Sequence, residues 1–276
     1  MRVYHYKRKG GLLNFGDDLG PATVEFTLGE TVKFGGPMTA NIMGVGSILS
    51  TWSKRRAWRR NICDKTFSRK PIAIWGSGVI GQREVILPRC TVLAVRGPLT
   101  QKVIGCDKIA VFGDPGLLAS RMIEKVTSVN KIGIVPHYVD KNHPVVRELQ
   151  SDKSFTVIDV EQEWHRVLAQ ISACDLILSS SLHGLIVADS YGIPNSRLSF
   201  SDAIVGGDFK FFDYGLSVGR GKIEAHSVVS IKDIYRAAHN YKDLDRIVSS
   251  RVVHEINDRL MDRLLSWAKK DHSAGL

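Results

Sequence analysis

The sequence predicts an α/β protein that contains two parallel β-sheets. Short β-branched runs, typical of buried strands, alternate with helical segments along most of the chain. This alternation stops near residues 125–130 and then restarts, and 276 residues are enough for two modest domains that each bury a core. We therefore expect one α/β domain over residues 1–126, a second over 127–225, and helices over 226–276 packed on the body of the protein.

Five runs in the first half are predicted to be strands: Arg2–Tyr6, Asn41–Val45, Pro71–Trp75, Thr91–Val95 and Ile109–Phe112. A glycine-bearing loop follows the first strand, and an apolar helix is expected at about Pro21–Leu28. Pro98 suits the first turn of a helix that extends to about Ile104. Asp114 can cap a further helix that Pro115 opens.

The second half repeats the alternation more regularly. Strands are expected at Lys131–Val135, Phe155–Asp159, Asp175–Leu178 and finally Asn195–Leu198. The helices expected between or after them are His143–Gln150, Glu161–Ser172 and Leu182–Tyr191. The tail then changes period, because apolar residues recur every four positions: Leu244, Val248, Val252, Ile256, Leu260, Leu264 and Ala268. This spacing predicts a long amphipathic helix packed on the body of the protein.

Composition narrows the class of protein. A 43% hydrophobic and 24% charged chain is ordinary for a globular protein, and no apolar run approaches the roughly 18 residues of a membrane span. The first residues lack the apolar core of a signal peptide, so we expect a cytoplasmic location. The four cysteines form no C-x-x-C pair and are expected to be reduced packing residues. His137, Asp140 and His143 have only an unspecific ligand spacing, so no metal site is predicted.

The formal net charge of +10 suggests anionic partners, and it is unevenly placed. Eight basic residues fall within residues 54–70, opposed only by Asp64, and Trp52 and Trp58 are interleaved with them. This pattern fits a segment over residues 52–70 that rests on an anionic membrane surface, and it fits a solvated basic loop equally well. Since no nucleic-acid-binding module accompanies the segment, nucleic acid is not an expected partner.

The most informative stretch runs from Ile177 to Ala188. A predicted strand ends there, serines 179–181 follow, and His183 falls in the first turn of the next predicted helix. Hydroxyls, free N–H groups and the positive end of a helix dipole would then converge, which is an arrangement that binds phosphate or carboxylate. A histidine at this point can hold and deliver a proton at neutral pH. The alternative is that Ser180 or Ser181 only caps the helix and His183 packs locally.

Other candidate residues also follow predicted strands. Asn14, Asp17 and Asp18 lie in a glycine-bearing turn that can bind sugar hydroxyls or accept a proton, or in which an aspartate caps the next helix. Arg96 follows a strand and can fork onto a carboxylate or phosphate, or form a structural salt bridge. His137 occupies the equivalent edge of the second domain.

Two familiar motifs are excluded. Gly76–Gly81 fits G-x-G-x-x-G, but Pro88 interrupts the segment that follows and no acidic residue stands at the expected ribose position. These glycines are expected instead to let the backbone approach substrate or the partner domain. No G-x-S-x-G motif surrounds Ser179–Ser181, so these serines are not expected to be nucleophiles.

Five blocks, taken together and in order, resemble the polysaccharide pyruvyl transferase family. They are Asn14–Leu19, Gly44–Ile48, Arg96–Thr100, Gly113–Pro115, and Ser179–Gly184 with Ala188 and Gly192–Pro194. The resemblance implies two Rossmann-like domains arranged as in GT-B glycosyltransferases. It also implies transfer of the pyruvyl unit of phosphoenolpyruvate to two hydroxyls of one sugar, which forms a cyclic ketal and releases phosphate. The acceptor would be a bacterial polysaccharide or its lipid-linked precursor, with no further cofactor, and peripheral association with the inner face of the membrane is a corresponding hypothesis.

The resemblance also implies roles for individual residues. His183 would be the acid or would steady the phosphate, which Ser180, Ser181 and the helix start at Leu182 and Gly184 would hold. Arg96 would take the carboxylate or phosphate. Asp17 or Asp18 would orient or deprotonate the sugar hydroxyl. The cleft lining would include Asn14, Gly46, Ser47 and His137.

One position departs from the family pattern. Many members carry Arg-Leu-His where this chain has Ser181-Leu182-His183, and the missing arginine removes a contact worth about 1.5–3 kcal/mol. Arg197, Lys210 and Arg220 are candidates to replace it. The alternative functions are a glycosyltransferase with a nucleotide-sugar donor, for which Glu224 is the nearby candidate ligand, and a non-catalytic glycan- or lipid-binding subunit.

Overall fold

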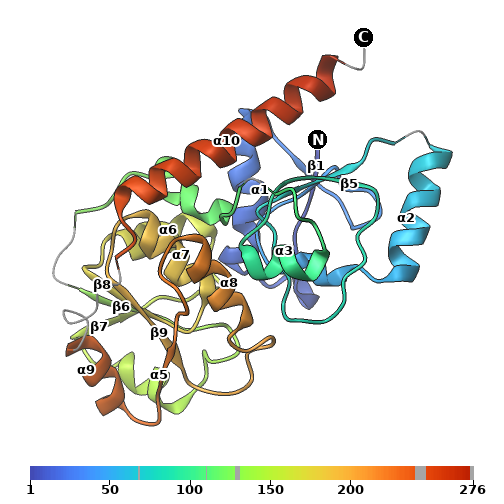
Figure 1. Ribbon diagram of the computed structural model, residues 1–276. Helices are drawn as coiled ribbons and strands as arrows, with labels where there is room; N and C mark the ends of the chain where they lie inside the picture. Colours follow the sequence, from blue (N-terminus) through green and yellow to red (C-terminus); the bar gives the residue numbers. More distant parts are fainter. Residues whose placement is uncertain (68, 110, 128–130, 240–246, 274–276) are drawn as a thin grey trace.

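The protein is described by a computed structural model that covers residues 1–67, 69–109, 111–127, 131–239 and 247–273. Two five-stranded sheets, all of whose strand pairs are parallel, lie side by side with helices packed around them (Figure 1). The prediction of an α/β protein with two parallel sheets is therefore confirmed.

The first sheet has the order β2-β1-β3-β4-β5. Its strands are β1 (Arg2–Tyr4), β2 (Lys33–Phe34), β3 (Ile42–Met43), β4 (Ile72–Trp75) and β5 (Cys90–Ala94). The second sheet has the order β10-β9-β8-β6-β7. Its strands are β6 (Ile132–Val135), β7 (Phe155–Val157), β8 (Leu176–Ser179), β9 (Asn195–Ser199) and β10 (Ala225–Ser227).

Helices connect these strands and cover both sheets. Those of the first half are η1 (Lys9–Gly11), α1 (Phe15–Leu28), η2 (Ile48–Thr51), α2 (Lys54–Thr66), α3 (Pro98–Ile104), η3 (Pro115–Leu118) and α4 (Ala119–Met122). Those of the second half are α5 (Pro144–Leu149), α6 (Trp164–Ser172), α7 (Leu182–Ser190), α8 (Phe209–Ser217), α9 (Ile231–His239) and α10 (Ser250–Ser273). Asp114 accepts a hydrogen bond from the Gly116 N–H, as expected of a capping residue.

Three element predictions are wrong. The first long helix starts at Phe15 and contains Pro21, so Asp17 and Asp18 lie in its first turn and not in a loop. The segment Ile109–Phe112 contributes only an isolated bridge between Phe112 and Val95, with Ala110 outside the described residues. Asn195–Leu198 is not the last strand, because β10 extends the sheet. Three residues at an exposed edge are too short to show a period in the sequence.

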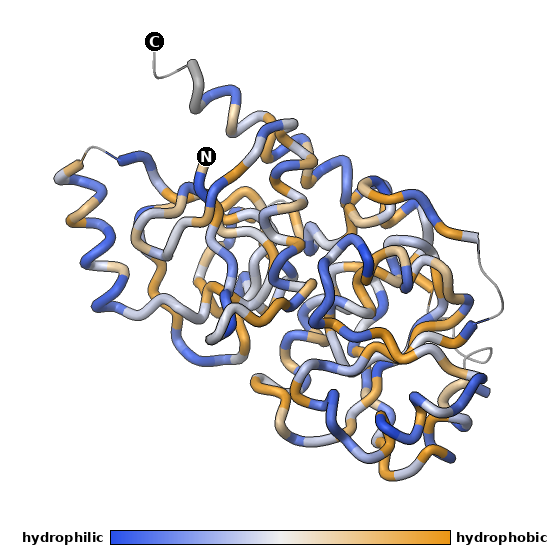
Figure 2. The backbone as a smooth tube through the Cα atoms, turned by 180° about the vertical axis from the view of Figure 1, so that it is seen from behind, coloured by the Kyte–Doolittle hydropathy of each residue, from blue (hydrophilic) through white to orange (hydrophobic). Residues whose placement is uncertain are grey.

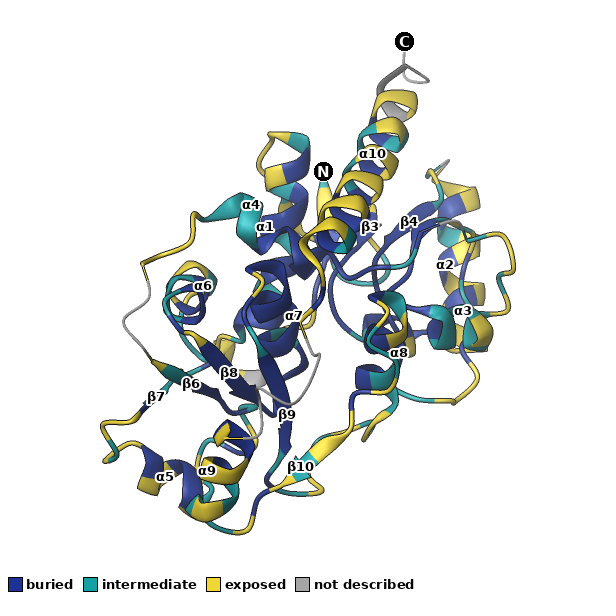
Figure 3. Ribbon diagram, turned by 60° about the vertical axis from the view of Figure 1, so that its left-hand side comes forward, coloured by how far each residue is buried: buried dark blue, intermediate teal, exposed yellow. Residues whose placement is uncertain are grey.

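The long helix α10 packs against the region between the two sheets (Figure 3). Its buried side, with Val253, Ile256, Leu260 and Leu264, belongs to one apolar cluster with residues of β3, β4 and α7. The Trp75 indole donates a hydrogen bond of 2.9 Å to the Leu260 carbonyl. Val248 precedes the helix and is buried, whereas Leu244, which was expected to begin the stripe, lies outside the described residues.

The basic segment over residues 52–70 forms α2 and the residues that flank it, and only part of it lies on the surface. Trp52 is 2% exposed and its indole N–H contacts the Met43 sulfur, so the expectation that this tryptophan belongs to the surface is wrong. Arg60 is buried in an ion pair with Asp64 and donates to the carbonyls of Pro37 and Ala40. Trp58, at 63% exposure, does lie on the surface. Among the helices described, none has both the length and the apolar composition needed to cross a bilayer.

Candidate active site

A cavity of about 400 Å³ lies where the two sheets meet, and it is lined from both of them. Most of its lining follows the carboxyl ends of parallel strands, which is where ligands bind in open α/β sheets. The polar and aromatic lining residues are Tyr4, Tyr6, Asn14, Asp17, Ser47, Ser50, Thr51, Arg96, His137, Tyr138, Ser181, His183 and Lys210. Gly46, Ile48, Ile80, Val160, Leu182 and Val205 complete the wall.

His183 lies half-buried in the first turn of α7, and its buried Nε2 atom has no hydrogen-bond partner among the described residues. The ring packs tightly against the first turn of α1, because a Cβ atom added to Gly16 would lie 2.2 Å from His183 Nδ1. Burial, followed by the charges of Lys210 and Arg96, lowers the pKa of His183 to about 3. The lowered pKa favours the neutral imidazole in the free protein, and the expectation that His183 delivers a proton to a bound anion stays a prediction.

The three serines before α7 have different roles. The Ser180 hydroxyl donates to Asp140 at 2.7 Å and accepts from the His137 N–H at 2.8 Å, and Ser180 does not line the cavity. Ser179 donates to backbone carbonyls. Ser181 lines the cavity, and its side chain makes no capping hydrogen bond to α7. The free N–H groups of the first helical turn and the Ser181 hydroxyl thus remain available to an anion.

Asp17 and Asp18 are neighbours with different surroundings. Asp17 lines the cavity and accepts a hydrogen bond of 2.6 Å from the Asn14 amide. Burial, partly offset by that bond, raises the pKa of Asp17 to about 7. Asp18 is absent from the cavity lining, so of the two carboxylates considered only Asp17 is positioned to meet a ligand there.

Lys210 brings a cation into the cavity from α8. Its side chain is nine-tenths buried, and the described residues offer its ammonium no hydrogen bond. Burial, followed by the charges of Arg96 and Arg197, lowers the pKa of Lys210 to about 8. The sequence offered Lys210 only as one of three replacement cations. A lysine beside the apolar residues of a helix carries no local sign that it faces a cavity built mostly from other elements.

Arg96 lines the cavity but forms the structural salt bridge that was its alternative interpretation. It is completely buried, with Nε 3.0 Å from Asp213 and one terminal nitrogen donating to Ser47 at 2.8 Å. The other terminal nitrogen donates to the Val79 carbonyl at 2.7 Å. A Cβ atom on Gly78 would lie 2.3 Å from the guanidinium carbon. Gly78 therefore makes room for Arg96, and the expectation that these glycines approach substrate is not met there.

Three other predicted ligands, Arg197, Arg220 and Gly184, lie outside the cavity lining. Arg197 pairs with Asp208 at 2.6 Å and stacks on Phe211, and Arg220 pairs with the buried Asp189 at 3.0 Å. Gly184 allows α7 to pack on β8, because a Cβ atom there would lie 2.3 Å from the Ser179 hydroxyl. Of the three candidate cations, only Lys210 reaches the cavity.

His137 lines the cavity, and burial lowers its pKa to about 3. The residues near it in sequence have structural partners. Asp140 accepts hydrogen bonds from Ser180 and Ser201, and His143 accepts one from the Val145 N–H at the start of α5. Across the described residues, no group of three or more histidine, cysteine, aspartate or glutamate side chains is placed to hold a metal ion.

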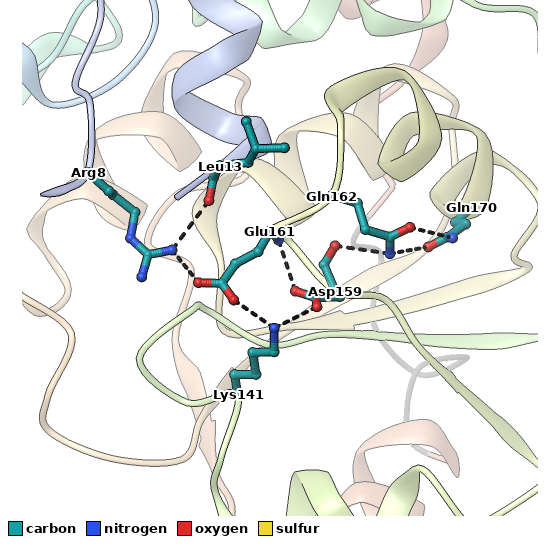
Figure 4. A network of polar contacts seen from close by, with 7 residues as sticks. All are labelled: Arg8, Leu13, Lys141, Asp159, Glu161, Gln162 and Gln170. Carbon is teal, nitrogen blue, oxygen red and sulfur yellow. Dashed lines mark hydrogen bonds and ion pairs between the residues drawn. The ribbon is translucent and has the colours of Figure 1, made fainter. Parts of the chain in front are cut away.

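A polar network joins the two halves of the molecule beside the cavity (Figure 4). Arg8, from the loop after β1, pairs with Glu161 of the second half, and Glu161 pairs with Lys141 at 2.6 Å. Lys141 also pairs with Asp159 at 2.7 Å, and the Arg8 guanidinium lies 4.0 Å from the centre of the Tyr138 ring. The Phe15 N–H donates to the Val160 carbonyl across the same junction at 3.0 Å.

These observations define a class of protein: two parallel α/β sheets with a cavity between them that is lined by Lys210, by His137 and His183, and by Asp17. Comparison with known families specifies the class. Residues 29–201 match the family model described as polysaccharide pyruvyl transferase, and the chain belongs to this family.

Two curated relatives match the chain. The succinoglycan biosynthesis protein ExoV of Rhizobium meliloti (strain 1021) is 26% identical over 223 residues, which cover 79% of this chain and 65% of ExoV. The uncharacterized protein L143 of Acanthamoeba polyphaga mimivirus is 35% identical over 159 residues, which cover 53% of this chain and 55% of that protein. The chain thus spans between about half and two thirds of the length of these relatives. A functionally uncharacterized protein of Klebsiella pneumoniae has a solved structure that aligns with a TM-score of 0.44 at 11% identity, over 79% of this chain and 86% of that one.

Proposed function

We propose that this protein transfers the pyruvyl unit of phosphoenolpyruvate to two hydroxyls of one sugar, forming a cyclic ketal in polysaccharide biosynthesis. The observation that carries the proposal is the anion site at the start of α7. There the unpartnered and fully buried Nε2 atom of His183 lies in a cavity with the Lys210 ammonium and the uncapped N–H groups of α7. A donor that carries both a phosphate and a carboxylate supplies the negative charge that this site lacks.

The reaction balances without a further co-reactant. The donor C3 carbon gains a proton, and the two sugar oxygens form bonds to C2 while the C2–O bond to phosphate breaks. The two sugar hydroxyls lose two protons in all. One of these is matched by the proton that C3 gains when it becomes a methyl group, and the other is carried away by the released phosphate. Asp17, with a pKa of about 7, can accept a proton from a sugar hydroxyl and give one up near neutral pH. A bound dianion would raise the pKa of His183, which then donates a proton or a hydrogen bond to the phosphate.

Lys210 takes the place of the arginine that the family pattern has at Ser181. Its ammonium, the Ser181 hydroxyl and the first N–H groups of α7 would hold the phosphate and carboxylate. The acceptor would enter from the side of Tyr4, Tyr6 and Tyr138, whose rings offer flat apolar faces to a sugar. The shared cavity between two sheets is consistent with a GT-B-like arrangement. We propose a cytoplasmic protein that meets its acceptor at the inner face of the membrane.

The test is phosphate release from phosphoenolpyruvate with a panel of lipid-linked or synthetic sugar acceptors. His183→Gln should lower kcat/KM at least about 100-fold, since it removes the proton-transfer group. Lys210→Met should raise the KM for phosphoenolpyruvate about 10- to 100-fold, and Lys210→Arg should restore part of it. The matched controls are His165→Gln and Lys232→Met, which change exposed residues on α6 and α9.

Two outcomes would contradict the proposal. Binding of nucleotide sugars without binding of phosphoenolpyruvate would favour a glycosyltransferase, although Glu224 is exposed and does not line the cavity. Glycan binding that His183→Gln leaves unchanged, with no phosphate released by any variant, would favour a non-catalytic subunit. Arg96→Ala is not a clean test, because it leaves Asp213 buried without its ion-pair partner.

A further inference from the structure

Helix α2 lies at the edge of the molecule, and hydrophilic residues alternate with more hydrophobic ones along it (Figure 2). Only Ala57, Arg60 and Asp64 are buried, and they form one narrow stripe. At 3.6 residues per turn, Trp58 and Ile62 fall on the opposite side of the helix and are therefore directed away from the body. Their exposures are 63% and 45%, and Phe67, just past the end of the helix, is 66% exposed. Large apolar residues are not expected in the middle of a helix face that contacts only water.

Cations flank this apolar pair on both sides. Lys54 and Lys65 lie on one side of Trp58 and Ile62, and Arg55 and Arg59 lie on the other; all four are exposed. The one acidic residue of α2, Asp64, is buried in its pair with Arg60, so it does not reduce the positive charge of the outer face. An open hollow of about 610 Å³ runs along the helix beside Met38, with Arg55, Arg56 and Arg59 in its wall.

We infer that α2 docks the protein on an anionic lipid bilayer, with Trp58 and Ile62 at the level of the headgroups and the flanking cations against lipid phosphates. The inference rests on the proposed function, in which the protein meets its acceptor at the inner face of the membrane. Bilayers accept apolar and basic residues on one helix face, whereas a nucleic acid would use the cations and leave Trp58 and Ile62 unexplained. The hollow lined by arginines has the charge that an anionic headgroup requires.

The docking surface is connected to the cavity by a short stretch of chain. Ser47, Ile48, Ser50 and Thr51 form part of the cavity wall, and α2 begins three residues after Thr51. Arg56 donates a hydrogen bond to the Thr51 carbonyl, which links the first turn of α2 to that wall. Docking through α2 therefore holds the cavity near the membrane surface, where a sugar carried on a lipid diphosphate is presented.

Sedimentation with vesicles tests this inference without donor or acceptor, so its outcome is separate from that of the proposed reaction. The protein should sediment with vesicles of equal parts phosphatidylcholine and phosphatidylglycerol, and much less with phosphatidylcholine alone. Added salt should weaken the binding. Arg55→Glu/Arg59→Glu should lower the partition coefficient at least about tenfold. Arg147→Glu/Arg166→Glu, which makes the same change in net charge at exposed positions on α5 and α6, should lower it far less.

Tryptophan fluorescence supplies a second measurement that does not depend on net charge. Emission should shift to the blue on anionic vesicles, and the shift should be lost in Trp58→Phe while binding remains. Trp58→Ala should reduce binding. Equal sedimentation with both vesicle types, equal loss in the two double-glutamate variants, or displacement of the vesicles by duplex DNA at equal phosphate concentration would each overturn the inference.

Discussion

Asp17 is a carboxyl group whose ionisation is costly in the folded protein. It lies in the first turn of α1, faces the cavity, and has the Asn14 amide as its one hydrogen-bond donor among the described residues. Burial raises its pKa from 3.8 to about 7. Between these two values the folded state binds more protons than the unfolded state, so folding stability falls as pH rises through this window.

Asp17→Asn should therefore stabilise the protein at pH 8 and have little effect on stability at pH 3.5. Urea unfolding at a series of pH values measures the difference, with Asp262→Asn, which changes an exposed carboxylate of α10, as the control. If Asp17 moves a proton in the reaction, kcat/KM of the wild type should also rise through about pH 7, and Asp17→Asn should lack that limb. A wild type and an Asp17→Asn variant with parallel stability profiles would show that Asp17 ionises normally.

At the scale of elements, the site depends on the close approach of two helix starts. The first turn of α1 belongs to the first half of the chain and the first turn of α7 to the second, and they meet at Gly16 and His183. The Phe15 ring meets the His183 ring edge to face, with centroids 6.3 Å apart. Glycine is needed at position 16 for space, since any Cβ atom there would overlap the imidazole.

Gly16→Ala should lower activity at least about tenfold while the protein stays folded, because alanine suits a helix but displaces His183 from its position. Phosphate release and circular dichroism together measure this. Gly36→Ala is the matched control, since a Cβ atom there meets nothing within 4 Å. Activity of Gly16→Ala equal to that of Gly36→Ala would mean that the position of His183 does not matter to the reaction.

At the scale of the whole molecule, a shared core holds the two sheets together. One cluster unites Ile42 and Trp75 of the first sheet, Leu185 and Ile186 of α7, and Leu260 of α10. The network from Arg8 through Glu161 to Lys141 joins the halves on the cavity side. The cavity wall is therefore built from two sheets whose relative position is fixed by packing and by ion pairs.

Leu260→Ala should destabilise the protein by about 2–5 kcal/mol, because Leu260 is fully buried in this cluster. Since the cluster joins the first sheet to helices α7 and α8 of the second half, the variant should still unfold in a single transition, at a lower urea midpoint, when followed by tryptophan fluorescence and by circular dichroism. Arg263→Ala, one helical turn further on the exposed side of α10, should change the midpoint little. Two separate transitions in Leu260→Ala would show that the halves fold independently.

The sequence by itself determined the α/β class, the two parallel sheets and the strand ends from which the cavity is lined. Local signals are sufficient for these features: Pro98 indicates the start of a helix that the structure places at Pro98–Ile104, and the serine–histidine stretch lies at the start of α7, as predicted. At least one candidate residue after each of the strands β3, β5, β6 and β8 reaches one cavity, because the carboxyl ends of parallel strands share an edge.

Only the tertiary structure decided which of two neighbouring residues faces the cavity and which cations stay available. Asp17 faces inward and Asp18 does not, and Ser181 is available while Ser180 is bound to Asp140. The physical reason is that these features depend on contacts between residues far apart in the sequence. Arg96 is neutralised by Asp213, 117 residues away in sequence, whereas Lys210, three residues before that aspartate, has no such partner among the described residues. Periodicity reports the neighbours of a residue along its own element, but its partners on other elements are set by packing.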